Sequence, residues 1–153
     1  MNAALMTTSD PFTLERFVEA QASTYANALA EIRRGSKRSH WMWFVFPQLV
    51  GLGRTSTAQD YAIGSLEEAR AYLEHRLLGL RYMECVGALQ DRATSDPVIV
   101  FGALDAMKLR SSLSLFEAAR PHALFAAALD RWFGGEREPR TLQLLAQAGE
   151  QAH

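Results

Sequence analysis

One stretch of the chain combines positive charge with large aromatic rings. Residues 37–48 read Lys-Arg-Ser-His-Trp-Met-Trp-Phe-Val-Phe-Pro-Gln, and four of these twelve residues are aromatic. No Asp or Glu occurs at positions 32–59, an interval that carries five Lys and Arg residues. Cations beside flat rings combine charge recognition with stacking, which suits a phosphate-bearing ligand that contains a ring. The pattern predicts a basic and aromatic binding site.

The candidate ligand-binding residues come from three segments of the sequence. The first segment is residues 37–48, which we call the aromatic string. In the second, the turn Gly51-Leu52-Gly53 leads into hydroxyl residues, and exposed backbone amides at this helix start could bind an anion. The third segment, 108–114, places hydroxyls beside cations on a predicted helix. The full set is Lys37, Arg38, Trp41, Trp43, Arg54, Tyr61, Lys108, Arg110, Ser111 and Ser112.

We expect a positively charged depression where Lys37, Arg38 and Arg54 approach Lys108 or Arg110. If these cations instead point away from one another into separate solvent regions, or each pairs with an acidic residue such as Asp60 or Asp105, the anion-site hypothesis loses its basis, because an ion pair consumes the charge that an anion needs.

Each segment also has a simpler structural interpretation. The rings of the string fill a core, while the cations end the preceding helix near its negative pole. The Gly-rich turn lacks the Lys-Ser/Thr ending of a phosphate-binding loop, so one of its hydroxyls simply caps a helix. The hydroxyl groups of serines inside a helix usually donate hydrogen bonds to backbone carbonyls of the same helix.

Four aromatic residues at 41, 43, 44 and 46 cannot all face the same way on a helix, since successive positions differ by about 100°. We therefore expect His40 and Trp43 to belong to the pocket, and Phe44 and Phe46 to be structural. If the site has a general base, His40 is the first candidate, because an imidazole exchanges protons near neutral pH.

Other chemistry finds little support in the sequence. The four histidines, at 40, 75, 122 and 153, show no zinc-binding spacing, so we expect no metal and no cofactor. The single cysteine, Cys85, lies on an apolar helical face and is expected to be buried and inert. One cysteine suits a reducing compartment, and with no export signal or membrane-spanning run in view we expect a cytoplasmic protein.

Length and composition favour one soluble globular domain. The chain has 153 residues, a net charge of −1 and 48% hydrophobic residues. These values argue against a generally basic nucleic-acid binder and against a disordered chain. The expected domain spans 10–148, between weakly ordered ends at 1–9 and 149–153.

Residue usage predicts an all-α fold, because 24 Ala and 20 Leu stand against 6 Val and 3 Ile. We expect a compact bundle of about seven or eight short helices with no significant sheet. An apolar stripe runs over 14–32 and ends at Gly35, with Ser23 or Thr24 able to divide it. Ser65 and Glu68 form a capping box that begins a helix through 73.

The remaining expected elements are helices at 58–62, 78–91, 104–118, 124–133 and 141–148, and a short apolar turn at 98–101. The predicted core includes Phe17, Leu29, Leu78, Leu89, Phe125, Leu129 and Trp132.

Several segments resemble the bacterial family called domain of unknown function 1810: 37–48, 51–54, 57–63, 108–116 and 133–136. The resemblance covers about residues 10–145 and implies a compact all-helical domain. It brings no activity, cofactor or catalytic residue. Some members carry the label calpastatin, but that inhibitor is largely disordered, whereas this composition is globular.

Two functions remain as hypotheses. The first is an enzyme or sensor for a small anionic metabolite, nucleotide-like or phosphorylated. The second is a non-enzymatic module whose aromatic and basic face docks a partner protein. A concave, convergent site favours the ligand, and a flat surface with a polar rim favours the partner. Nucleic acid is a weaker candidate, because the basic interval is short.

Overall fold

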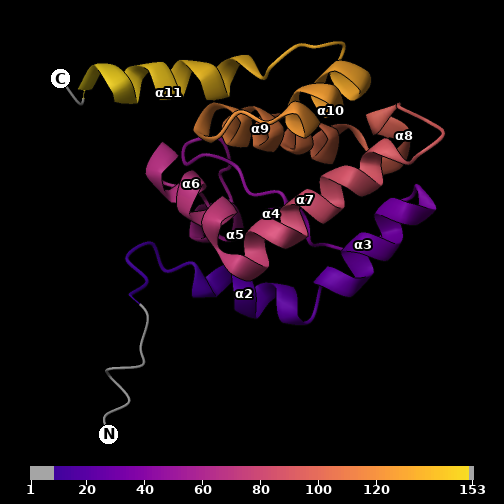
Figure 1. Cartoon of the computed structure of the whole chain (residues 1–153), viewed down its shortest axis with the longest axis horizontal. Helices are drawn as coiled ribbons and strands as arrows, with labels where there is room; N and C mark the ends of the chain where they lie inside the picture. The colour runs from indigo at the N-terminus through magenta and orange to yellow at the C-terminus, as the bar shows by residue number, and fades with distance from the viewer. Residues whose placement is uncertain (1–8, 152–153) are drawn as a thin grey trace, which may run out of the picture.

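The computed structural model describes residues 9–151 and folds them into ten helices (Figure 1). These are α2 (Glu15–Ala22), α3 (Tyr25–Arg34), α4 (Met42–Val45), α5 (Ser56–Asp60), α6 (Leu66–Glu74), α7 (Arg76–Gln90), α8 (Pro97–Phe101), α9 (Ala103–Ala119), α10 (Ala123–Phe133) and α11 (Pro139–Gln151). Within these residues the only β-type pairing is an isolated parallel bridge between Leu49 and Ile63. The all-α class is confirmed.

The helix count corrects the expectation of seven or eight. Two of the helices have only four and five residues. Helix α4 lies inside the aromatic string, where we expected no separate helix, and α8 lies where we expected an apolar turn. The last helix continues to Gln151, past the expected boundary at 148. Most of the expected N-terminal tail, residues 1–8, lies outside the described residues, as do residues 152 and 153.

Helices α2 and α3 share one apolar stripe that is broken at Ser23 and Thr24, where the sequence allowed a division. Gly35 ends α3 with a φ of 78°, a left-handed conformation that glycine adopts at low cost. Before α2, the carboxylate of Asp10 accepts a hydrogen bond from the backbone N–H of Leu14 at 2.8 Å. Local signals therefore set both ends of this helical pair.

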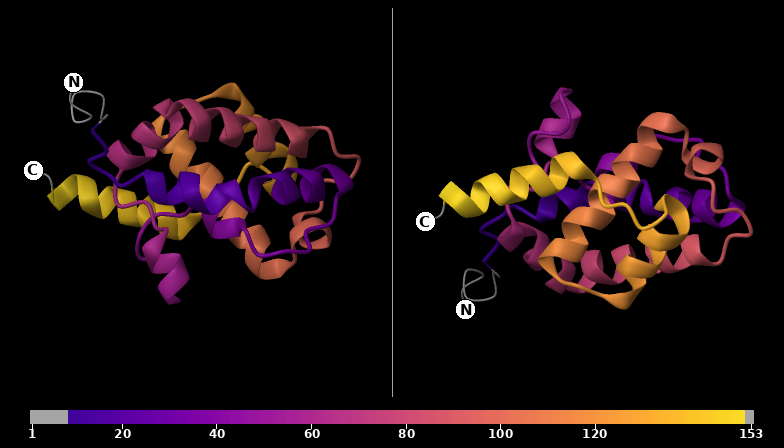
Figure 2. Two further views of the ribbon diagram at one scale, coloured as in Figure 1. Left: turned by 90° about the horizontal axis from the view of Figure 1, so that it is seen from below. Right: turned by 90° about the horizontal axis from the view of Figure 1, so that it is seen from above.

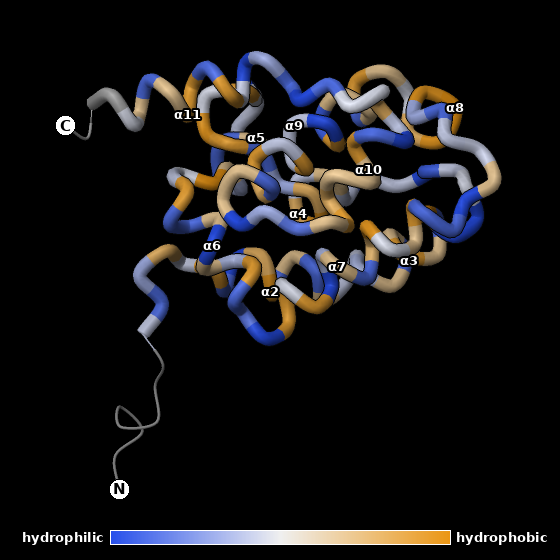
Figure 3. The backbone as a smooth tube through the Cα atoms, turned by 45° about the horizontal axis from the view of Figure 1, so that its top comes forward, coloured by the Kyte–Doolittle hydropathy of each residue, from blue (hydrophilic) through white to orange (hydrophobic). Residues whose placement is uncertain are grey.

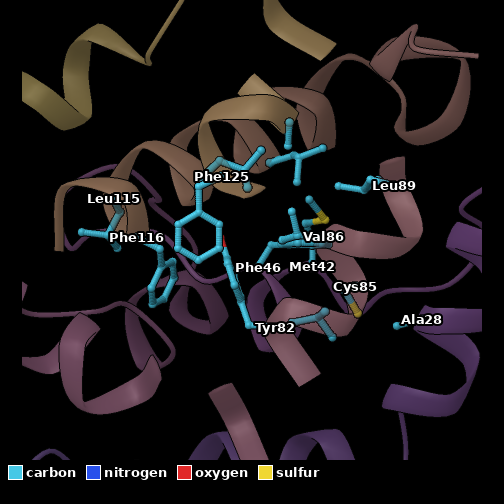
Figure 4. Packing of buried hydrophobic residues seen from close by; sticks show 14 of the residues in the cluster. Ala28, Met42, Phe46, Tyr82, Cys85, Val86, Leu89, Leu115, Phe116 and Phe125 are labelled. Atoms are coloured by element: carbon cyan, nitrogen blue, oxygen red, sulfur yellow. The ribbon is translucent and has the colours of Figure 1, made fainter. Parts of the chain in front are cut away.

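The core lies where α9 packs against α6, α8 and α10, with α7 closing it from the other side. Tyr82 is central to this packing, and Figure 4 shows it together with Phe46, Phe116 and Phe125. The centre of its ring lies 4.4 Å from that of Phe116 and 5.6 Å from those of Phe46 and Phe125. Six of the seven predicted core residues are buried, and Leu29 is half-buried against the same cluster.

Helix α5 stands away from the body of the molecule in both views of Figure 2. None of its residues is buried. The arm that carries it, residues 50–62, is closed at its base by the Leu49–Ile63 bridge. The guanidinium of Arg16 reinforces this closure by donating to the carbonyls of Asp60 and Ala62, at 2.9 and 2.8 Å.

The corner between α8 and α9 exposes several apolar side chains. The residues of α8 are among those coloured as hydrophobic in Figure 3. The exposed residues are Val98, Ile99, Leu104 and Met107. Among the described residues, no helix is both long and apolar enough to cross a membrane.

Candidate functional site

A buried carboxylate organises the loop that carries the basic end of the aromatic string. Glu31, on the last turn of α3, accepts hydrogen bonds from the backbone N–H groups of Arg38 and Ser39, the hydroxyl of Ser39, and the indole N–H of Trp41. Burial raises the pKa of Glu31, but these four donors outweigh it and lower the pKa to about 2. The loop is therefore wrapped around a fixed negative charge.

Lys37 is held inside this loop. Its backbone N–H donates to the carbonyl of Val100 at 2.8 Å, which joins the loop to α8. Its ammonium donates to the carbonyl of Ser39 at 2.6 Å and pairs with Asp105 of α9 at 2.8 Å. The side chain is only 8% exposed, so this charge has a fixed position.

Lys108 approaches the same carboxylate from the next turn of α9. Its ammonium lies 3.2 Å from the second carboxylate oxygen of Asp105 and 5.0 Å from the centre of the Trp43 ring. Its side chain is 27% exposed. Lys37 lies in the same way against Trp41, 5.1 Å from the ring centre. We call Lys37, Asp105 and Lys108 the lysine cluster.

The lysine cluster contains both lysines of the sequence, since the other fourteen basic residues are arginines. The structure brings Lys37 and Lys108 together at Asp105. Pairing with Asp105 is an outcome that we expected to count against an anion site, but here two ammonium groups share one carboxylate. One carboxylate balances one of two ammonium groups, so the cluster keeps a net charge of +1.

The aromatic string divides between core and surface. Trp41 is 1% exposed and Phe46 is fully buried, whereas Trp43 and Phe44 are half-buried, and Arg38 and His40 are exposed. Trp41 therefore packs in the core instead of offering its ring to a ligand, which corrects its expected role.

Arg54 and Tyr61 lie on the arm that carries α5. Thr55, which follows Arg54, caps α5 by accepting from the backbone N–H of Ala58 at 3.1 Å, as the simpler interpretation of this turn predicts. The ring of Tyr61 packs against that of Phe44, 4.7 Å away. Among the described residues, no hydrogen bond or ion pair joins Arg54 to the lysine cluster.

The other candidates on α9 have partners within the protein. Arg110 pairs with Glu136 at 3.2 Å. The hydroxyl of Ser111 donates to the carbonyl of Met107 at 3.0 Å, and that of Ser112 lies 2.9 Å from the hydroxyl of Tyr82. Both serines are buried, so their expected ligand-binding role is corrected to a structural one.

Two carboxylates that shape the site were not among the expected site residues. Glu31 lies immediately before the acid-free interval, three positions after the buried Ala28, a spacing that places both on one helical face. From the sequence alone, Asp105 counts only as a residue that neutralises the cations. Its position three residues before Lys108 is the signal that both lie on one side of α9.

Other reactive groups of the described residues are accounted for structurally. Cys85 is buried, as expected, and this burial raises the pKa of its thiol to about 12. No group of three His, Cys, Asp or Glu side chains in residues 9–151 could hold a metal ion. Three surface hollows of about 340, 230 and 240 Å³ lie beside His75, Phe125 and Leu145. None of these three hollows is lined by a residue of the lysine cluster, so the positively charged depression that we expected is not one of them.

Comparison with known proteins agrees with the resemblance seen in the sequence. The model of a family described as Protein of unknown function (DUF1810) matches residues 11–145. The crystal structure of the conserved hypothetical protein Rv1873 from Mycobacterium tuberculosis is similar, with a TM-score of 0.88 and 49% sequence identity. The match covers 90% of this chain and 99% of that one. No curated protein matches the chain.

Proposed function

We propose, from the premise that the chain belongs to the DUF1810 family of proteins of unknown function, that the lysine cluster and Trp43 bind a small anionic ligand containing a flat ring. Nucleotides and phosphorylated ring metabolites are the class that fits. The observation that supports this most is the sharing of one carboxylate by two ammonium groups beside a half-buried indole.

The charge balance of the cluster favours an anion. Asp105 compensates one positive charge, and the second remains close to the surface on Lys108. A phosphate or carboxylate placed there gains a charge-assisted hydrogen bond. Lys37 is already fixed by the loop, so its side chain loses little entropy when the ligand arrives.

Trp43 adds selectivity for rings. Its indole is half-buried and already contacts the Lys108 ammonium, so a ligand ring can stack on it while the anionic group meets the lysine. His40 and Arg38 are exposed on the same loop. We assign Arg38 to charge recognition and His40 to proton transfer in any reaction at this site.

A thermal-shift screen against nucleotides, sugar phosphates and carboxylates tests this function, because a ligand that binds the native state raises the apparent stability. We expect a hit whose affinity falls about tenfold or more in Lys108→Met. The matched control is Arg140→Met, which removes an exposed cation elsewhere and should leave the affinity unchanged. Equal losses in both variants would show general charge attraction and contradict a site.

A second function is supported by the apolar corner of α8 and α9. The exposed residues Val98, Ile99, Leu104 and Met107 form an unusual concentration of apolar side chains. The backbone hydrogen bond from Lys37 to Val100 joins the loop after α3 to α8, and the next residue of this loop is the exposed Arg38. This combination fits an acidic partner segment that carries apolar side chains.

Binding of a labelled amphipathic peptide made of Glu and Leu tests the docking function. We expect saturable binding that is lost in the double variant Ile99→Ser with Leu104→Ser. Leu80→Ser is the control, because Leu80 is a similarly exposed leucine on α7. Unsaturable binding, or an equal loss in the control, would show only nonspecific hydrophobic attraction.

A further inference from the structure

We infer that the lysine cluster also forms a covalent bond, in which the amine of Lys108 condenses with the carbonyl group of an anionic ligand to give an imine. This inference rests on the proposed function, since the same residues hold the ligand. It narrows the ligand to an aldehyde or ketone that carries a phosphate or carboxylate.

The use of lysine at these two positions is the first support. The chain contains fourteen arginines and two lysines, and both lysines meet at Asp105. Every other ion pair among the described residues uses arginine. A guanidinium cannot lose its proton in a protein, whereas an ammonium can lose its proton and become a nucleophile. Charge alone does not require lysine at position 108, but carbonyl chemistry does.

The surroundings of the two ammonium groups assign them different roles. Lys37 is nearly buried and has two partners, the carbonyl of Ser39 and Asp105. Lys108 is more exposed, and among the described residues its hydrogen-bonding or ionic partner is Asp105 alone. A carbonyl group can therefore reach Lys108 beside the Trp43 ring. Lys37 supplies the fixed charge that holds the phosphate or carboxylate of the ligand.

Asp105 is placed to move the proton that this reaction requires. The Lys108 ammonium gives one proton to Asp105, and the neutral amine attacks the carbonyl carbon. A nitrogen–carbon bond forms, and transfer of a second proton from nitrogen to oxygen yields the carbinolamine. Asp105 then returns its proton to the hydroxyl group, which leaves as water. The sum is an ammonium and a carbonyl giving a protonated imine and water, with Asp105 unchanged.

Reductive trapping tests the inference. The folded protein is mixed with pyridoxal 5′-phosphate, a flat-ring aldehyde with a phosphate, and with sodium cyanoborohydride, and adducts are located by peptide mass spectrometry. We expect one saturable adduct on Lys108, formed at least about tenfold faster than on an ordinary exposed lysine. The variant Arg140→Lys supplies that reference lysine within the same fold, because Arg140 is exposed and outside the cluster.

Three variants separate the roles. Lys108→Arg keeps the charge and should abolish the fast adduct. Asp105→Asn should slow trapping about 100-fold, as expected for loss of a proton-transfer group. Lys37→Met removes the charge that holds the phosphate, so it should weaken saturation by the probe and leave the adduct on Lys108. Circular dichroism checks that each variant is folded. If Asp105→Asn is unfolded, the inference is still tested by comparing the labelling rate of Lys108 with that of the reference lysine in Arg140→Lys.

Pyridoxine 5′-phosphate, which has the same ring and phosphate but an alcohol in place of the aldehyde, distinguishes the two proposals. If it binds and pyridoxal 5′-phosphate labels Lys108 no faster than the reference lysine, the imine is overturned and anion binding stands. If it does not bind and labelling is slow, both proposals fail. Fast labelling of Lys108 without binding of the alcohol would show a reactive lysine that does not depend on the anion site, and it would contradict both the anion binding and the inference that rests on it.

Discussion

The indole N–H of Trp41 donates to the carboxylate of Glu31 at 2.9 Å, and this bond joins the aromatic string to the end of α3. The same carboxylate accepts three further hydrogen bonds from Arg38 and Ser39. The fold of the loop that presents Lys37 therefore depends on one ionised side chain.

Acid should weaken the fold through Glu31. Hydrogen bonding lowers its pKa from the ordinary value of 4.5 to about 2, so its ionised form stabilises the folded state above about pH 4.5. This stabilisation, roughly 3 kcal/mol, should be lost as the pH falls toward 2. Urea unfolding at pH 5, 4, 3 and 2 measures it.

The variant Glu31→Gln isolates this contribution, because an amide does not titrate. We expect it to be less stable than the parent at pH 5 and to lose less stability on acidification. Glu67→Gln, on the exposed start of α6, is the control and should behave like the parent. A Glu31→Gln variant that loses as much stability on acidification as the parent would contradict this role.

Truncation of Leu129 to Ala should lower the free energy of unfolding by roughly 2–5 kcal/mol, because Leu129 is fully buried and the change leaves a cavity. Leu104→Ala is the matched control at a position that is 81% exposed, and it should change stability by less than about 0.5 kcal/mol. Urea unfolding measures both changes, as shifts of the unfolding midpoint at an unchanged slope of free energy against urea concentration. A small effect at Leu129 would place it outside the core.

Neighbouring aromatic residues should respond differently to truncation. Phe46→Ala should cost about 3–5 kcal/mol of stability, because its ring is fully buried against Tyr82. Trp43→Ala should cost less and should weaken ligand binding more than it lowers stability. His40→Ala should leave the fold intact and remove any turnover. If Trp43→Ala unfolds the protein as Phe46→Ala does, Trp43 is a core residue and has no place in the site.

Replacing a capping imidazole by a carboxylate should stabilise α10. His122 caps this helix by accepting from the backbone N–H of Leu124 at 2.9 Å. His122→Asp keeps an acceptor and adds a negative charge at the positive end of the helix, so we expect a gain of about 0.5–1 kcal/mol. His122→Ala should lose a similar amount. Thermal unfolding at neutral pH and low salt measures both changes in stability. Equal melting temperatures for the parent and both variants would contradict a capping role for His122.

Local patterns predicted most of the helices. Ser65 caps α6 by accepting from the backbone N–H of Glu68 at 3.1 Å, as the capping box requires. The carboxylate of Glu68 accepts a hydrogen bond from the backbone N–H of Gly64 at 2.8 Å, one residue earlier than the motif predicts. Helix α4 was missed because it has only four residues, which is too short for a helical periodicity to appear.

The candidate site was only partly predictable, because its geometry depends on long-range contacts. Lys37 and Lys108 were both expected, but their meeting at Asp105 follows from the packing of the loop against α8 and α9. Ser111 and Ser112 were misassigned because a helical position alone does not tell a solvent-facing hydroxyl from a buried one.

The closed base of the α5 arm has a consequence for how the chain tolerates changes in length. Leu49 and Ile63 pair where the arm leaves and rejoins the body, so the thirteen residues between them begin and end at nearly the same place. Lengthening such a segment costs only a slowly growing loop entropy, about 0.6 kcal/mol for each doubling. Insertions, or a grafted peptide epitope, should therefore be accepted in this arm without disturbing the helices that hold the lysine cluster.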